Sequence, residues 1–242
     1  MADNRKEQER DELHRTIWGI ANDLRGSVDG WDFKQYVLGM LFYRYISENF
    51  ANYINDGERE AGDATFDYAQ LSDSDAEQAR DDLIKTKGFF ILPSQLFCSV
   101  RSRAPLDENL NETLEAVFQA IEDSAKGSDS EANFSGLFDD IDVNSNKPGG
   151  TVAERNKRLV KLMNGVGDMK LGDYRDNTID AFGDAYEYLM GMYASNAGKS
   201  GGEYFTPQEV SELLTRIAVA GKPEVNKVYE IKTRYLIQNT AS

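Results

Sequence analysis

The sequence predicts a mainly α-helical protein of 242 residues. Apolar side chains recur at spacings of three and four residues through most of the chain, which places them on one face of a helix. Residues that cap helix N-termini precede several of these stretches, and glycines follow them. Hydrophobic residues make up 40% of the chain and charged residues 29%, a composition typical of a globular protein.

Two helices are predicted near the N-terminus. In the first, Ile17, Ile20 and Leu24 form an apolar stripe. The second begins at Asp32, whose carboxylate can cap the free N–H groups of a first turn. Its residues 33–46 are apolar on nearly every face, which is typical of a helix in the centre of a bundle.

The middle of the chain alternates between polar and apolar segments. Residues 56–82 are polar and acidic, which indicates surface loops and one solvated helix, capped by Ser74. Residues 88–93 form a short apolar run ended by proline, and its length leaves open a brief strand or a buried extended connector. Residues 107–124 carry an apolar helical stripe followed by glycine.

A turn-rich break at residues 144–150 predicts a linker between two domains. We therefore expect a helical N-terminal domain over residues 1–147 and a second domain over residues 151–242. Thr151 and Glu154 form a capping box at the start of the second domain.

Three helices and one strand are predicted in this second domain. The first helix ends at the glycines of residues 164–167, the second covers residues 177–194, and the third starts at residues 206–207 and stops at Gly221. Residues 225–231 are compatible with one strand.

Composition excludes several classes of function. Lys and Arg number 27 against 42 Asp and Glu, a net charge of −15, so the chain is poorly suited to gripping DNA phosphates by itself. One cysteine (Cys98) and one histidine (His14) exclude an intrachain disulfide and zinc sites built from paired Cys or His, and we expect no metal. No apolar run approaches the roughly 20 residues of a membrane span, and no signal peptide is present, so we expect a cytoplasmic protein.

A group of basic residues follows the turn-rich break: Arg155, Lys157, Arg158 and Lys161. On a helix they share a basic face. Two interpretations remain open, a solvated surface and a contact with DNA or a partner subunit.

Residues 198–209 are the most informative stretch of the chain. Thr206 can cap a helix, and Pro207 suits its first position because proline lacks an N–H. The free N–H groups and the positive end of the helix dipole would suit a carboxylate ligand. Tyr204 or Phe205 could cover an aromatic or sulfonium-bearing ligand. The structural alternative is a well-capped helix preceded by two core aromatics.

This stretch resembles the start of the catalytic domain of HsdM, the modification (methyltransferase) subunit of type I restriction–modification systems. Further resemblances to that family occur in order along the chain. The segments that carry the resemblance are Trp31–Leu38, Leu41–Ile46, Gly88–Ser94, Phe134–Phe138, Asp184–Leu189 and Gly201–Pro207.

The resemblance implies a helical domain followed by a methyltransferase domain of the α/β, Rossmann-like type. The family transfers a methyl group from S-adenosylmethionine (SAM) to N6 of adenine in DNA. Its helical domain helps clamp DNA and contacts other subunits. The implied partners are a DNA-specificity subunit, a second methyltransferase subunit, a restriction subunit and, within the assembly, DNA. The implied cofactor-binding residues are Glu203, Tyr204, Phe205, Thr206, Pro207 and Gln208.

The resemblance departs from the family after Tyr229. A glycine-rich SAM loop is expected there, but no glycine follows Gly221. The catalytic motif Asn-Pro-Pro-aromatic is also absent, since none of the five prolines is adjacent to another. We therefore assign no catalytic residue and expect a truncated methyltransferase domain that does not methylate DNA alone. Two alternatives are a non-enzymatic module that docks on a specificity or methyltransferase subunit, and a helical protein whose match is accidental.

Overall fold

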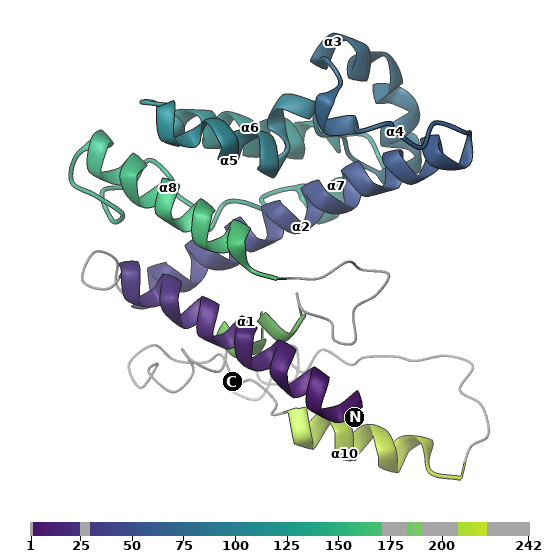
Figure 1. Ribbon diagram of the computed structural model, residues 1–242, viewed down its shortest axis with the longest axis vertical. Coiled ribbons are helices and arrows are strands. Elements are labelled where there is room, and N and C mark those ends of the chain that lie inside the picture. The colour runs from purple at the N-terminus through teal and green to yellow at the C-terminus, as the bar shows by residue number, and fades with distance from the viewer. Residues whose placement is uncertain (1, 25–29, 171–182, 186, 190–207, 222–242) are drawn as a thin grey trace, which may run out of the picture. The chain divides into compact units, whose positions relative to one another are not determined.

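The computed structural model describes residues 2–24, 30–170, 183–185, 187–189 and 208–221, and within them every regular element is helical, as predicted (Figure 1). The chain divides into two compact units, residues 1–200 and residues 201–242. The α-helices of the first unit are α1 (Ala2–Leu24), α2 (Gly30–Glu60), α3 (Asp73–Ala76), α4 (Arg80–Lys87), α5 (Phe97–Arg103), α6 (Leu110–Ser124), α7 (Glu131–Phe134) and α8 (Val152–Asp168). Its short 3-10 helices are η1 (Tyr68–Gln70), η2 (Glu77–Ala79), η3 (Pro93–Gln95) and η4 (Ala104–Leu106). The second unit contributes α10 (Gln208–Val219), and the strand expected over residues 225–231 lies outside the described residues.

The helix α2 supplies much of the core of the first unit, as its uniformly apolar sequence predicts. Met40, Leu41 and Tyr43 are fully buried. The Tyr43 hydroxyl donates a hydrogen bond of 2.5 Å to the carbonyl oxygen of Gln95, so its polar group is satisfied in the core. Burial raises the pKa of Tyr43 well above its usual value. The helix begins at Gly30, two residues before the predicted start at Asp32.

The apolar run after α4 is a buried extended connector, which settles the alternative left open by the sequence. Phe89, Phe90 and Ile91 are buried without a neighbouring strand among the described residues. Side chains take the place of a sheet partner: the Phe90 N–H donates to Ser124 Oγ at 2.9 Å, and the Tyr68 hydroxyl donates to the Ile91 carbonyl at 2.8 Å. Buried backbone groups thus remain paired.

The acidic segment forms short helices, and one predicted cap is wrong. The N-cap of α3 is Ser72, whose Oγ accepts a hydrogen bond from the Asp75 N–H at 3.1 Å, whereas Ser74 lies inside the helix. The predicted cap at Thr151 is confirmed, since its Oγ1 accepts from the Glu154 N–H at 3.2 Å. In both cases a hydroxyl pairs with an N–H group that the first helical turn leaves free.

The helix α8, which we expected to open the second domain, packs into the first unit. It contacts α1, α2, α5 and α6, and Figure 1 shows it crossing α2. Arg44 of α2 binds the C-terminal end of α8. Its guanidinium Nη1 donates to the carbonyl oxygens of Val166 at 2.7 Å and Met169 at 2.8 Å. A cation at a helix C-terminus pairs with carbonyl groups that have no partner within the helix.

The turn-rich stretch before α8 is also held in place. Arg155 Nη2 donates to Asn146 Oδ1 at 3.2 Å, and Arg158 donates to the Pro148 carbonyl. From the other side, Asn111 Nδ2 donates to Asn144 Oδ1 at 2.5 Å. Residues 144–150 are therefore tied to the first unit on two sides.

The glycines at residues 164–167 do not end α8, which continues to Asp168. They allow close packing instead. A Cβ on Gly165 would lie 2.5 Å from Ile20 Cγ1 of α1, and a Cβ on Gly167 would lie 2.3 Å from Arg101 Nη1 of α5. A side chain at either position would displace its neighbour.

Among the helices that the structure describes, none combines the length and the apolar character that a membrane span requires.

Replacing Gly165 by valine should destabilise the protein by about 1–3 kcal/mol, because the new side chain would force α8 away from α1. Urea unfolding at neutral pH measures this change. The matched control is Gly19→Ala in α1, where an added Cβ would meet no atom within 4 Å. That variant should be stabilised by roughly 0.5–1 kcal/mol through helix propensity. Equal stability of the two variants would contradict close packing at Gly165.

Candidate functional site

The predicted cofactor segment is described only at its end. Residues 203–207, which include five of the six predicted SAM contacts, lie outside the described residues. Gln208 is the first residue of α10. Thr206 and Pro207 lie outside the described residues, so their placement at the start of the helix stays a prediction.

The helix α10 carries apolar residues on one face. Val210, Leu213, Leu214 and Ile217 follow the spacing of three and four residues. They are 44–64% exposed. The helix therefore presents an apolar stripe along its length and free N–H groups at its start.

The segment at residues 184–189, which carries one of the family resemblances, packs on α1. Ala185 and Leu189 are fully buried. The ring of Tyr188 stacks on the ring of His14 with centroids 3.9 Å apart. His14 is thus an internal contact of the first unit.

Charge pairing strengthens the contact between α1 and this segment. Arg10 Nε donates to Asp184 Oδ2 at 2.9 Å, and this hydrogen bond raises the pKa of Arg10. Burial lowers the pKa of His14, and the charges of Asp184 and Asp11 oppose that effect in part. No local sequence pattern indicates the Arg10–Asp184 or the His14–Tyr188 contact, because the partners lie far apart in the chain. For Arg10 and Asp184 the separation is 174 residues.

The predicted basic face of α8 is smaller than its four residues suggest. Arg155 is only 7% exposed and Arg158 is half-buried against the preceding turn, whereas Lys157 and Lys161 are exposed. The two arginines bind backbone and amide groups of residues 144–150, so only the lysines are available to a partner.

No group of three His, Cys, Asp or Glu side chains among the described residues is placed to hold a metal ion. Cys98 is exposed, although the nearby Phe97 and Val100 are buried.

Comparison with known proteins decides the family. Residues 13–166 match the HsdM N-terminal domain. The chain belongs to the HsdM family. Residues 177–232 match a second family, the N-6 DNA methylases. The two matches follow one another along the chain, so the helical unit precedes a methylase-like segment.

Individual HsdM relatives agree with this assignment. The chain is 46% identical to the type I restriction enzyme MpnII methylase subunit of Mycoplasma pneumoniae over 236 residues, which covers 95% of the chain and 43% of the relative. It is 21% identical to the MjaIX methylase subunit of Methanocaldococcus jannaschii, over 85% of the chain and 35% of that protein. The chain spans less than half the length of either relative.

A solved structure supports the fold. The crystal structure of the type I restriction–modification methyltransferase subunit from Streptococcus thermophilus superposes with a TM-score of 0.70 at 28% identity. The match covers 88% of this chain and 44% of that one. The helical fold of the first unit is therefore that of the HsdM family.

Folding stability should fall between pH 7.5 and pH 5.5 in a way that depends on His14. Because its pKa is lowered in the folded state, the unfolded chain takes up a proton first as the pH falls through the ordinary value of about 6.5. Stability from the neutral ring is present above that pH and lost below it. Urea unfolding at both pH values should show a smaller loss for His14→Phe, which keeps a ring against Tyr188. Identical losses for the two proteins would contradict this account.

Proposed function

We propose that this chain provides the helical N-terminal domain and the beginning of the methyltransferase domain of a type I restriction–modification modification subunit. In the assembled enzyme it would help to hold DNA and to join subunits while the methyl group passes from SAM to adenine N6. The main support is the order of the two family matches, at residues 13–166 and 177–232, on a helical unit with the family's fold.

We further propose that the helical domain extends through α8. The packing of α8 on α1, α2, α5 and α6 supports this division, as does the methylase match that begins at residue 177. The methyltransferase portion would then start after α8, not at the turn-rich stretch before it.

The proposed SAM contacts are Glu203, Tyr204, Phe205, Thr206, Pro207 and Gln208. SAM supplies an activated methyl group and carries an α-carboxylate. The start of α10 fits that carboxylate in part, because a helix of 12 residues presents free N–H groups and a positive dipole end just where these residues precede it. The glycine-rich loop that lets backbone approach SAM has no counterpart after Gly221 in this sequence.

A second candidate is a non-enzymatic docking module, and two observations favour it. The chain contains no pair of adjacent prolines, so it lacks an Asn-Pro-Pro motif to hold a target base. Its net charge of −15 opposes autonomous DNA binding. In this case the chain would act through a DNA-specificity subunit, a second methyltransferase subunit and a restriction subunit, with DNA held by the assembly.

The purified chain should transfer no methyl group from tritiated SAM to DNA, because the sequence lacks the groups that hold the target amine. Scintillation counting of recovered DNA measures this, with a complete type I methyltransferase as the positive control. Transfer above the no-protein background would contradict the proposal of inactivity.

Calorimetric titration with SAM separates the two candidates. Binding that is weakened about tenfold or more in a Tyr204→Ala, Phe205→Ala double variant, and unchanged in Tyr45→Ala, would support a residual cofactor site. Tyr45 is a suitable control because it is an exposed aromatic residue of α2. Absence of heat, together with co-purification with the specificity subunit, would favour the docking module. Absence of both would contradict the proposed function.

A further inference from the structure

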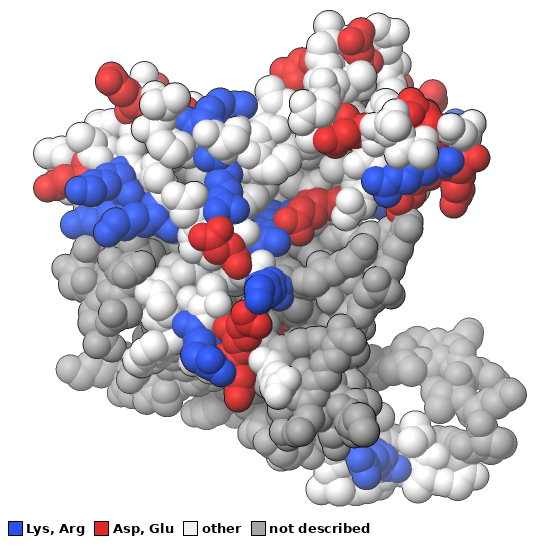
Figure 2. Space-filling view, viewed as in Figure 1, with Lys and Arg blue, Asp and Glu red and all other residues white. Residues whose placement is uncertain are grey.

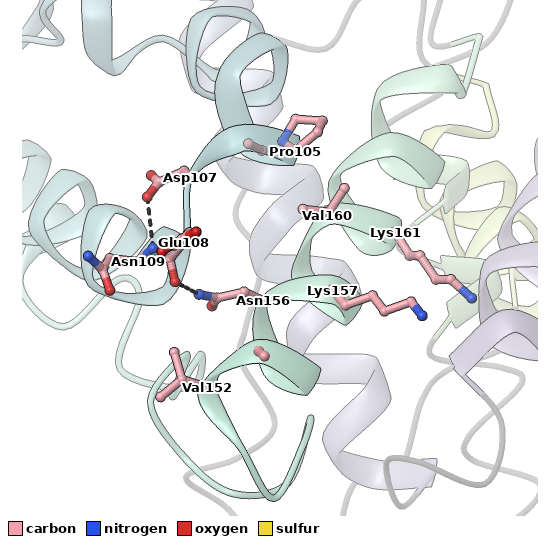
Figure 3. Close-up of a pocket in the computed structure, with 11 residues that line it drawn as sticks. Pro105, Asp107, Glu108, Asn109, Val152, Asn156, Lys157, Val160 and Lys161 are labelled. Carbon is pink, nitrogen blue, oxygen red and sulfur yellow. Dashed lines mark hydrogen bonds between the residues drawn. The ribbon is translucent and has the colours of Figure 1, made fainter.

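An open groove of about 720 Å³ lies between the turn that precedes α6 and one side of α8. One wall consists of Ala104, Pro105 and residues 107–109. The other consists of the α8 residues Val152, Ala153, Asn156, Lys157, Val160 and Lys161. Figure 3 shows Val152 and Val160 on the α8 wall, with Lys157 and Lys161 extending away from the opposite turn. The groove thus combines apolar lining residues from both walls with two lysines on its α8 side.

Hydrogen bonds from Asn156 of α8 to the opposite wall and to α6 fix the two walls relative to one another. Asn156, which is 6% exposed, donates from Nδ2 to the Glu108 carbonyl at 2.6 Å and accepts at Oδ1 from the Asn111 N–H at 3.1 Å. The walls are therefore held in place before any partner arrives, which lowers the conformational cost of binding.

One exposed aliphatic side chain, Val152, lines the groove, and a second, Leu106, lies in the turn between the lining residues Pro105 and Asp107. Leu106 is 88% exposed and Val152 is 47% exposed. The other large hydrophobic residues exposed in the described part of the first unit are aromatic: Trp18, Tyr45 and Tyr53. In the described part of this unit, both exposed aliphatic side chains thus lie on the two segments that form the groove.

The charges at the groove indicate the chemistry of its partner. Lys157 and Lys161 lie one helical turn apart, are exposed, and form no ion pair with any described residue. Figure 2 shows Lys and Arg gathered at the side of the molecule where α8 lies. On the other wall the Asp107 carboxylate already accepts from the Asn109 N–H at 2.9 Å and Thr113 Oγ1 at 2.7 Å.

We propose that this groove binds an amphipathic helix of a partner protein. Its aliphatic side chains would cover Leu106 and Val152, and its acidic side chains would lie along Lys157 and Lys161. Exposed Glu108 on the opposite wall sets the orientation, because it repels acidic groups from that side. A groove that combines apolar side chains with two lysines fits a helix better than DNA, whose binding needs many cationic contacts. The inference deepens the proposed function and rests on it for the presence of a partner subunit.

Fluorescence anisotropy with a labelled helical peptide tests the groove directly. The probe carries leucines at spacings of three and four residues and glutamates beside them. It should bind the full chain saturably, and Lys157→Glu combined with Lys161→Glu should weaken binding about tenfold or more. Leu106→Ser should also weaken it, without loss of stability, because this side chain is almost fully exposed. The control variant Lys85→Glu with Lys126→Glu changes the charge equally at exposed lysines outside the groove and should bind as the parent does.

Several outcomes would overturn the proposal. These are no saturable binding of the acidic peptide, equal binding of a peptide with lysines in place of its glutamates, or unchanged affinity in the groove variants. A labelled DNA duplex provides a further arm: DNA binding lost in the lysine variant but kept in Leu106→Ser would identify a nucleic-acid site instead. Circular dichroism confirms that each variant is folded. Because no SAM or other subunit is used, failure here is distinct from failure of the proposed function.

Discussion

The close contact of α8 with α1 and α2 is the constraint on which the rest of the first unit depends. The contact requires Gly165, since a Cβ there would lie 2.5 Å from Ile20 of α1. Arg44 of α2 stabilises it by donating hydrogen bonds to carbonyl groups at the C-terminal end of α8. Once α8 is fixed, the turn-rich stretch before it is held by Arg155 and Arg158, and the α8 wall of the groove is in place.

Hydroxyl and amide side chains in the core pair with buried backbone N–H groups. A buried connector without a sheet partner leaves N–H and C=O groups that cost free energy unless they are paired. Ser47 accepts from the Phe97 N–H at 3.2 Å, Asn55 accepts from the Tyr68 N–H at 2.8 Å, and Ser124 accepts from the Phe90 N–H. Polar residues inside this apolar core are therefore part of its architecture. Ser124 pairs with the extended connector, whereas Ser47 and Asn55 pair with the first residues of α5 and η1.

The charge distribution agrees with a protein that functions in an assembly. An acidic chain repels DNA unless partners supply positive charge, and two relatives of this chain are methylase subunits of type I restriction enzymes. Acidic residues gather over α3 and α4, whereas lysines lie beside the groove at α8 (Figure 2). Partners of different charge would therefore be directed to different sides of the helical unit.

The sequence by itself determined the helical class, the central place of α2, the cap at Thr151 and the family, because these follow from local spacing, local hydrogen bonding and recognisable motifs. It did not determine whether the glycines of α8 end a helix or permit close packing, since both uses place glycine near a C-terminus. Nor did it show that Arg155 is buried, that Leu106 is exposed, or that His14 meets Tyr188. These facts depend on contacts between residues far apart in the chain, which only the tertiary structure brings together.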